Sequence, residues 1–303
     1  MTEGSLKMKL CLGTVQFGLK YGIAGNNQPN LASCIEMLDY AYQNDIYSFD
    51  TASAYGSAED VLGEFIKQRR INQNNIDINS KISPDVFKET NNNLYSSAKE
   101  CVIRSLKKLN VEYLDGCMLH NASVLDNEEV IEALNRLKKE GYVKKIGASV
   151  YTPKEAKKTF SHHEMEIIQI PYNIFDQRLN EDGFFDSRII ENKKIYARSA
   201  FLQGLLLMAV NDIPLYLSEA IPKVKRFEEL CKSYNITRTQ AAISFVKNND
   251  KIDYLVFGVD NLKQLKEFIE IFSKDIDKSV LKQISEEFTQ VSENIVMPFL
   301  WNK

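Results

Sequence analysis

Four residues of types that transfer or direct protons occur where buried strands are expected to end. Asp50 and Tyr55 have four residues between them, while Lys81 and His120 each close a later apolar run. A phenol has an ordinary pKa of about 10, so it needs a neighbouring cation to act as an acid near neutral pH. We predict that Lys81 lowers the pKa of Tyr55 and that Asp50 keeps Lys81 charged and in place. With His120 donating a hydrogen bond to a carbonyl oxygen, Tyr55 would deliver a proton to a carbonyl undergoing reduction.

Short apolar runs alternate with longer amphipathic segments, a pattern typical of repeated strand and helix units around a parallel sheet. Eight runs are predicted strands: 10–15, 46–51, 76–81, 113–120, 145–149, 167–171, 194–199 and 254–258. Nine segments are predicted helices: 31–44, 58–70, 95–109, 127–140, 153–160, 220–233, 237–246, 262–271 and 280–288. Eight strands favour an α/β fold of the closed (β/α)8 TIM barrel type. We expect a single domain over residues 1–303, with residues 1–7 flexible.

Active sites of such barrels lie at the C-terminal ends of the strands, which brings these four residues to one rim. Four further polar residues end other strands and would share that rim: Ser149, Gln169, Arg198 and Ser199. An open doubly wound sheet would normally carry a GxGxxG turn after its first strand. No such motif follows the first predicted strand here, so the closed barrel is favoured.

The bulk properties narrow the class of partner. The 303 residues are 44% hydrophobic and 26% charged with a net charge of -3, which argues against nucleic acid or an anionic membrane as partner. The five cysteines are scattered and form neither a disulfide framework nor a zinc pattern, so no metal is expected. With no apolar run of membrane-spanning length and no charged leader, we expect a cytoplasmic protein that binds small molecules.

The segment from Phe49 to Gly56, which contains Asp50 and Tyr55, resembles the signature of the aldo/keto reductase superfamily. Lys81 and His120 match the two remaining members of that family's catalytic tetrad. The resemblance extends from Leu12 to about Gly258, nearly the whole chain. It implies a barrel enzyme that reduces an aldehyde or ketone with a nicotinamide cofactor.

The same resemblance implies a cofactor site. Thr14 and Asp50 would lie beside the nicotinamide ribose, Ser149 and Gln169 would bind the carboxamide, and Arg198 would lie against the nicotinamide. Gly13 and Ser199 are also expected to bind the cofactor. The adenosine phosphate would bind at a helix start that includes Gly258, Gln264 and Glu267. The resemblance to the family implies NADPH as the cofactor. Because Gly258 and Gln264 replace a lysine and an arginine of many members and Asp260 would repel a phosphate, NADH is the alternative.

Other interpretations stay open from the sequence. Lys81 could form a Schiff base in a lyase, or the barrel could bind nucleotide only to regulate a partner. Phe175, Phe184 and Phe185 could line a substrate pocket, and a tail ending near Trp301 could cover either end of the barrel. Segment 198–206 resembles a bacterial branch that is sometimes linked to sugar metabolism, which suggests a sugar-derived carbonyl as substrate. The sequence does not indicate the oligomeric state.

Overall fold

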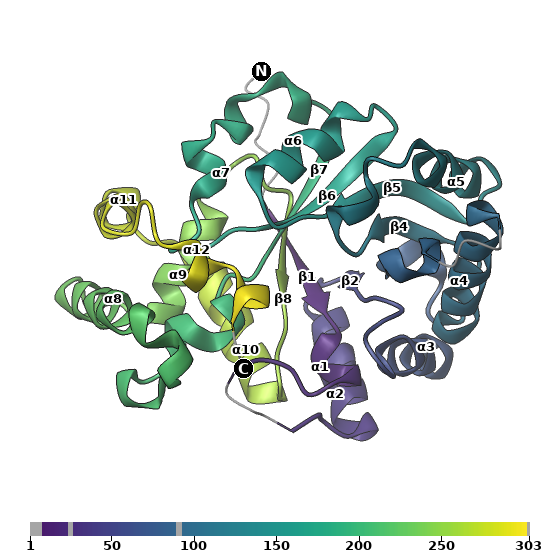
Figure 1. The fold of residues 1–303 in the computed structure, drawn as a ribbon. Helices are drawn as coiled ribbons and strands as arrows, with labels where there is room; N and C mark the ends of the chain where they lie inside the picture. The colour runs from purple at the N-terminus through teal and green to yellow at the C-terminus, as the bar shows by residue number, and fades with distance from the viewer. Residues whose placement is uncertain (1–7, 24–26, 89–92, 302–303) are drawn as a thin grey trace, which may run out of the picture.

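The computed structural model describes residues 8–23, 27–88 and 93–301, so the prediction that residues 1–7 are flexible lies outside the described residues. Eight parallel strands pair in chain order, and β1 pairs with β8 to close a barrel (Figure 1). The strands are β1 (Lys9–Gly13), β2 (Ser48–Asp50), β3 (Asp77–Ile82), β4 (Leu114–Leu119), β5 (Val143–Ser149), β6 (Met165–Pro171), β7 (Lys194–Arg198) and β8 (Tyr254–Phe257). All eight predicted strands are confirmed, and the fold is a single-domain (β/α)8 TIM barrel.

Helices surround the barrel (Figure 1). The nine predicted helices are all present within the described part of the chain, with bounds within two residues of the prediction: α2 (Leu31–Gln43), α3 (Ala58–Arg69), α4 (Leu94–Leu109), α5 (Glu128–Lys139), α6 (Pro153–Ser161), α8 (Ile221–Ser233), α9 (Arg238–Lys247), α10 (Leu262–Ser273) and α11 (Lys278–Glu286). Three single-turn helices were not predicted: α1 (Val15–Gly18), α7 (Arg178–Glu181) and α12 (Glu293–Val296). Short 3-10 helices fill several loops: η1 (Gln73–Asn75), η2 (Pro84–Phe87), η3 (Ala122–Val124), η4 (Phe184–Asp186), η5 (Arg188–Ile190), η6 (Leu202–Leu207), η7 (Val210–Asp212), η8 (Leu215–Ala220) and η9 (Pro298–Leu300).

Side-chain caps explain where many of these helices begin. Thr152 and Glu155 form a reciprocal capping box at the start of α6, because each side chain accepts a hydrogen bond from the other's backbone N–H. The Asn30 side chain accepts a hydrogen bond from Ser33 N at the start of α2. Each such cap satisfies an amide that the helix itself cannot pair.

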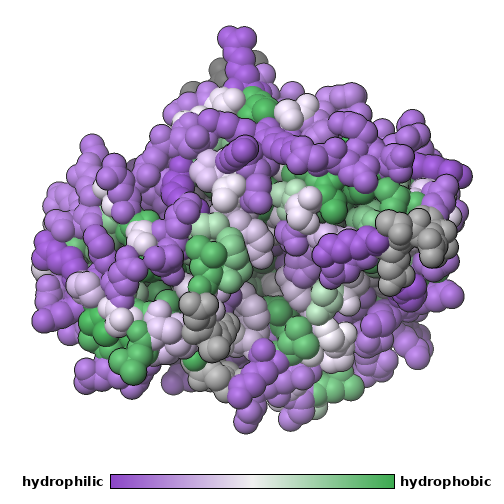
Figure 2. All heavy atoms as spheres, viewed as in Figure 1, coloured by the Kyte–Doolittle hydropathy of each residue, from purple (hydrophilic) through white to green (hydrophobic). Residues whose placement is uncertain are grey.

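The helices bury one apolar stripe against the outside of the barrel. In α4 this stripe includes Val102, Leu106 and Leu109, which are all buried. The five cysteines are also buried and carry free thiols. In the view of Figure 2 the surface is mostly hydrophilic, with hydrophobic residues in separate patches. None of the described helices is long and apolar enough to cross a membrane.

The barrel interior contains polar groups near the N-terminal ends of its strands. The hydroxyl of Tyr196 lies 3.5 Å from both Asp77 Oδ2 and Asn79 Nδ2, and its ring stacks on Tyr254 with centroids 4.5 Å apart. Burial raises the pKa of Asp77, and the nearby Asp115 carboxylate raises it further. This network therefore fills the base of the barrel at an electrostatic cost.

Several strands end earlier than predicted at the C-terminal rim. Val15, Thr51, His120, Ser199 and Gly258 each lie just beyond a strand, because the chain turns there toward the next helix. Thr51, His120, Ser199 and Gly258 therefore belong to the loops that build the rim, whereas Val15 begins α1.

The C-terminal tail lies near the rim rather than at the base of the barrel. The ring of Phe299 contacts that of Tyr151, just after β5, with centroids 4.9 Å apart. Trp301 is buried and donates from its indole nitrogen to Ile295 O at 3.2 Å. The tail thus adds to the wall beside the C-terminal ends of β5 and β6.

Candidate active site

A buried ion pair occupies the rim ends of β2 and β3. Lys81 Nζ lies 2.7 Å from both carboxylate oxygens of Asp50 and donates to Thr51 O at 2.9 Å. The side chains of Lys81 and Asp50 are only 1% and 5% exposed. Burial by itself would lower the pKa of Lys81, but the Asp50 carboxylate and the Tyr55 phenol together outweigh it and the pKa is raised. A permanently charged amine cannot attack a carbonyl, so the geometry opposes the Schiff-base interpretation.

Tyr55 and His120 complete the predicted cluster. The Tyr55 hydroxyl lies 3.5 Å from Lys81 Nζ, and the ring of His120 meets the Tyr55 ring edge-on with centroids 5.4 Å apart. The four residues singled out from the sequence are thus brought together from three segments: β2 with its loop, β3, and the residue after β4. Their arrangement can transfer a proton from the phenol to an oxygen held between Tyr55 and His120.

The prediction that Lys81 lowers the pKa of Tyr55 is confirmed, but burial has the larger effect on this phenol. Burial raises the pKa of Tyr55, the Lys81 ammonium opposes that effect, and the net result is a raised pKa. Tyr55 is therefore protonated at neutral pH, which suits a group that must donate a proton. The cation still matters, because it stabilises the phenolate that remains after transfer.

The imidazole of His120 is neutral at neutral pH. Burial lowers its pKa to about 4, and the positive charges of Lys81 and Arg198 contribute to that shift. A neutral imidazole carries one N–H donor and one acceptor nitrogen. His120 can therefore donate a hydrogen bond to a carbonyl oxygen without competing to protonate it.

Close backbone contacts fix the loop that carries Tyr55. A Cβ atom at Gly18 would collide with the carbonyl oxygen of Tyr55 and would lie 2.5 Å from Ala58 N, so only glycine permits this contact. Ser53 donates from its hydroxyl to Lys81 O at 2.9 Å. The loop is thus held both by α1 and by β3.

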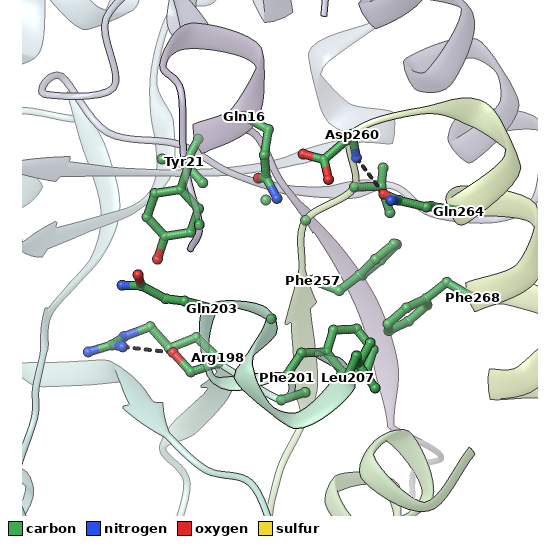
Figure 3. A pocket seen from close by; sticks show the side chains of 18 of the residues that line it. Gln16, Tyr21, Arg198, Phe201, Gln203, Leu207, Phe257, Asp260, Gln264 and Phe268 are labelled. Atoms are coloured by element: carbon green, nitrogen blue, oxygen red, sulfur yellow. Dashed lines mark hydrogen bonds between the residues drawn. The ribbon is translucent and has the colours of Figure 1, made fainter. Parts of the chain in front are cut away.

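A cavity of about 800 Å³ extends from this cluster to the start of α10. Figure 3 shows it bounded by Tyr21 and Arg198 at one side and by Asp260, Gln264 and Phe268 at the other. Most of the residues predicted to bind cofactor line it: Gly13, Asp50, Gln169, Arg198, Ser199, Gly258, Gln264 and Glu267.

Two predicted cofactor residues are not part of this lining. Thr14 is fully buried, and its hydroxyl donates to Asp50 O at 3.1 Å, so it holds β1 to β2. Ser149 is also buried and pairs in register with Gln169 on the neighbouring strand. Gln169 itself donates from Nε2 to Asp50 Oδ1 at 2.7 Å, which links its amide to the buried ion pair.

Arg198 is held by the loop after β5. Its guanidinium donates to Val150 O at 2.9 Å and to the Ser199 hydroxyl at 3.1 Å, and it lies 4.6 Å from the centroid of the Tyr151 ring. Because Phe299 contacts that same ring, the C-terminal tail buttresses the position of Arg198. The charge of Arg198 thus remains near His120 and Tyr55, whose pKa values it lowers.

Sequence reasoning missed the contributions of Gln16, Tyr21 and Gln203 to the cavity wall. Gln16 lies in the unpredicted α1, directly after β1. Ile23 N donates to Gln203 O at 3.3 Å, so the segment after α1 contacts η6 beside the cavity. The two glycines that bracket Gln16, Gly13 and Gly18, were the available signal for a tight turn at this position.

The proposed aromatic pocket is wrong. Phe175 packs on Phe227 and Phe288, and Phe184 stacks on Phe160, all away from the cavity. These rings are buried because the chain after β6 turns outward into the helical layer. They stabilise the packing of that layer and do not line the site.

Comparison with known proteins identifies the family. The model of the "Aldo/keto reductase family" matches residues 9–287. Relatives include the uncharacterized oxidoreductase YqkF of Bacillus subtilis (strain 168), 25% identical over 257 residues, which are 78% of this chain and 81% of that protein. The NADH-specific methylglyoxal reductase of Escherichia coli (strain K12) is 23% identical over 314 residues, covering 92% of this chain and 94% of that one.

A solved structure has the same fold. The aldo-keto reductase AKR11C1 from Bacillus halodurans superimposes with a TM-score of 0.76 at 20% identity, covering 94% of this chain and 93% of that one.

Because the family match spans most of the sequence, the chain belongs to the aldo/keto reductase family. It is therefore an NAD(P)H-dependent oxidoreductase.

Proposed function

We propose that this enzyme reduces an aldehyde or ketone, with Tyr55 as the general acid. The observation that carries the proposal is the buried pair of Lys81 and Asp50 with the Tyr55 hydroxyl 3.5 Å from Lys81 Nζ. Asp50 holds the ammonium in place, the ammonium stabilises the Tyr55 phenolate, and neutral His120 orients the carbonyl oxygen. The phenol then gives its proton to that oxygen as the carbonyl carbon is reduced.

The cavity fits a nicotinamide nucleotide. The residues that line it run from Tyr55 to the start of α10, and Gln16 Oε1 is a buried acceptor without a hydrogen-bond partner in the protein. We propose that Gly13, Gln169, Arg198 and Ser199 contact the nicotinamide end, and that the start of α10 contacts the adenosine end. When bound, the reduced nucleotide supplies the hydride.

A small carbonyl compound is the proposed substrate class. A relative is named as a methylglyoxal reductase, so methylglyoxal is a direct compound to test. We also propose keto-sugars and aldoses, because segment 198–206 resembles a branch linked to sugar metabolism. Turnover of simple aldehydes together with no turnover of any sugar would contradict the sugar proposal.

The test follows loss of reduced-nucleotide absorbance with NADH and NADPH separately, over a panel of aldehydes and keto-sugars. Tyr55→Phe is expected to lower kcat by about a hundredfold or more, the usual effect of losing a positioned general acid. Tyr113→Phe, which removes an exposed phenol that bonds Asn74 at 2.9 Å on the outer surface, is the matched control and should leave kcat unchanged.

Calorimetric titration of nucleotide onto Tyr55→Phe shows whether the variant still binds cofactor. Saturable nucleotide binding with no carbonyl turnover by the wild-type protein would contradict the proposal and favour a nucleotide-binding regulatory module. Equal turnover by wild type and Tyr55→Phe would contradict the role of Tyr55.

A further inference from the structure

The wall of the cavity at β8 and α10 is shaped around Gln16. The side chain of Gln16 lies directly over Gly258, where an added Cβ would meet its Nε2 at 2.5 Å. Gly258 therefore cannot take a side chain unless Gln16 moves. The carboxamide of Gln16 thus occupies the space in which a longer residue at position 258 would begin.

The amide oxygen of Gln16 accepts no hydrogen bond within the protein. Its Oε1 atom is buried and has no partner in the protein. A buried acceptor of this kind costs about 1–3 kcal/mol if it stays unpaired, so a ligand that donates a hydrogen bond to it is favoured. A ribose hydroxyl can donate to it, whereas an ionised phosphate oxygen only accepts.

The charged residues that line the cavity near α10 are acidic. Asp260 and Glu267 line it, and among the described residues of the cavity wall the sole arginine or lysine is Arg198, at the opposite, catalytic end. Lys263 and Lys266 are on α10 but outside the wall, where Lys263 lies 3.9 Å from Glu267 and Lys266 lies over the Tyr40 ring. A phosphate monoester carries about -1.5 to -2 charge at pH 7, so these carboxylates oppose its binding.

Two of the amide groups at the start of α10 are already paired within the chain. Asp260 N donates to Gln264 Oε1 at 2.8 Å, and Gln264 N donates to Asn261 Oδ1 at 3.0 Å. These amides are satisfied by the chain's own side chains. Those two amides are therefore already used and would not bind a phosphate.

Apolar rings lie next to these polar groups. Phe257 and Phe268 both line the cavity and stack on each other with centroids 4.0 Å apart (Figure 3). Phe201, just before η6, meets the ring of Phe268 edge-on with centroids 5.9 Å apart, and Leu207 of η6 also lines the cavity. A purine base would find an apolar surface here, with its ribose close to Gln16, Asp260 and Glu267.

We infer that this end of the cavity binds an adenosine ribose with both hydroxyls free and rejects a 2′-phosphate, so that the enzyme selects NADH over NADPH through Gln16 and Asp260. The inference rests on the proposed function, because it assumes that the cavity holds a nicotinamide nucleotide. It replaces the NADPH preference implied by family resemblance.

Isothermal titration calorimetry with four nucleotides tests it without turnover: NADH, NADPH, AMP and adenosine 2′,5′-diphosphate. The second pair differs only in the 2′-phosphate. We expect the wild-type protein to bind NADH at least about tenfold more tightly than NADPH, and AMP more tightly than the 2′,5′-diphosphate, since a tenfold difference needs only about 1.4 kcal/mol of repulsion. Equal or tighter binding of the two 2′-phosphorylated nucleotides would overturn the inference.

Two variants assign the selectivity to residues. Asp260→Arg should raise NADPH affinity by about tenfold and leave NADH affinity nearly unchanged. Gln16→Leu should weaken NADH by about fivefold to tenfold through loss of one hydrogen bond. Asp250→Arg makes the same charge change at an exposed site after α9 and should alter neither affinity. If Asp260→Arg acts no differently from Asp250→Arg, the role of Asp260 is wrong.

The outcomes separate this inference from the proposed function. Tight NADPH binding with active carbonyl reduction would overturn only the NADH selectivity. Failure of every nucleotide to bind would overturn both, since no hydride source would then be held.

Discussion

Replacing Lys81 by methionine tests the energetics of the buried ion pair directly. The substitution keeps an unbranched side chain of similar length but removes the ammonium that lies 2.7 Å from both oxygens of Asp50. The carboxylate then stays buried, at 5% exposure, with the Gln169 amide at 2.7 Å as its remaining side-chain donor. The variant is therefore left with a buried charge that is not neutralised.

Removing one partner of a buried ion pair costs about 3–5 kcal/mol. With an unfolding entropy of about 2.1 cal/mol/K per residue, the 303 residues give about 0.64 kcal/mol/K, so Tm should fall by about 5–8 °C. The loss should depend on pH. It should shrink in acid, because a carboxylate that takes up a proton no longer leaves a buried charge without its partner.

The assay is urea unfolding followed by circular dichroism at pH 7.5 and pH 5, on wild type, Lys81→Met and the double variant Asp50→Asn, Lys81→Met. The double variant carries no charge at either of these two positions and should recover at least about half of the lost stability. Lys139→Met, at an exposed site on α5, should change stability by no more than about 0.5 kcal/mol. A loss below about 1 kcal/mol for Lys81→Met at pH 7.5, or a loss that does not shrink at pH 5, would refute the reasoning.

Three further predictions concern other parts of the molecule. Burial lowers the pKa of His120 to about 4 in the folded protein, whereas the same group in the unfolded chain has a pKa of about 6.5. As pH falls below about 6.5 the unfolded chain takes up a proton first, so the stability of the wild-type protein drops by up to about 3 kcal/mol. Plots of the urea unfolding midpoint against pH should therefore be flatter for His120→Asn than for wild type. Gly18→Ala forces the Tyr55 carbonyl to move and should lower kcat by at least about tenfold in steady-state assays, and an unchanged kcat would contradict the positioning role of that contact. Burial raises the pKa of Asp77 in the folded protein, so this residue contributes to stability below its unfolded pKa and loses that contribution as pH rises through its folded pKa. Asp77→Asn should therefore stabilise the protein by about 1 kcal/mol at pH 7 and by nearly nothing at pH 4, as measured by urea unfolding.

Much of the fold and of the catalytic cluster could be predicted from the sequence because both depend on pattern. Strands buried on both faces appear as short apolar runs, and parallel barrel strands place their C-terminal ends on one rim. Once the barrel was inferred, Asp50, Lys81 and His120 had to lie near one another. The observed distances follow from that topology.

The remaining features depend on loop conformation and on sums of opposing effects. Gln16 faces the cavity only because α1 turns the chain directly after β1, and nothing in its residue type indicates that helix. The pKa of Tyr55 depends on whether burial or Lys81 has the larger effect, which cannot be judged without the degree of burial. The orientation of the Phe175 and Phe184 rings could not be predicted either, since an aromatic residue near the rim can face either the cavity or the helices.

Asp50 links three strands of the barrel to the residues of the catalytic cluster. Its carboxylate receives hydrogen bonds from β3 and β6, while its backbone oxygen accepts from both the amide and the hydroxyl of Thr14 after β1. Local opening of any of these contacts would separate the groups that carry out proton transfer. Loss of activity on heating should thus coincide with the onset of amide hydrogen exchange in β1, β2 and β3, so that turnover itself reports whether this part of the barrel is closed.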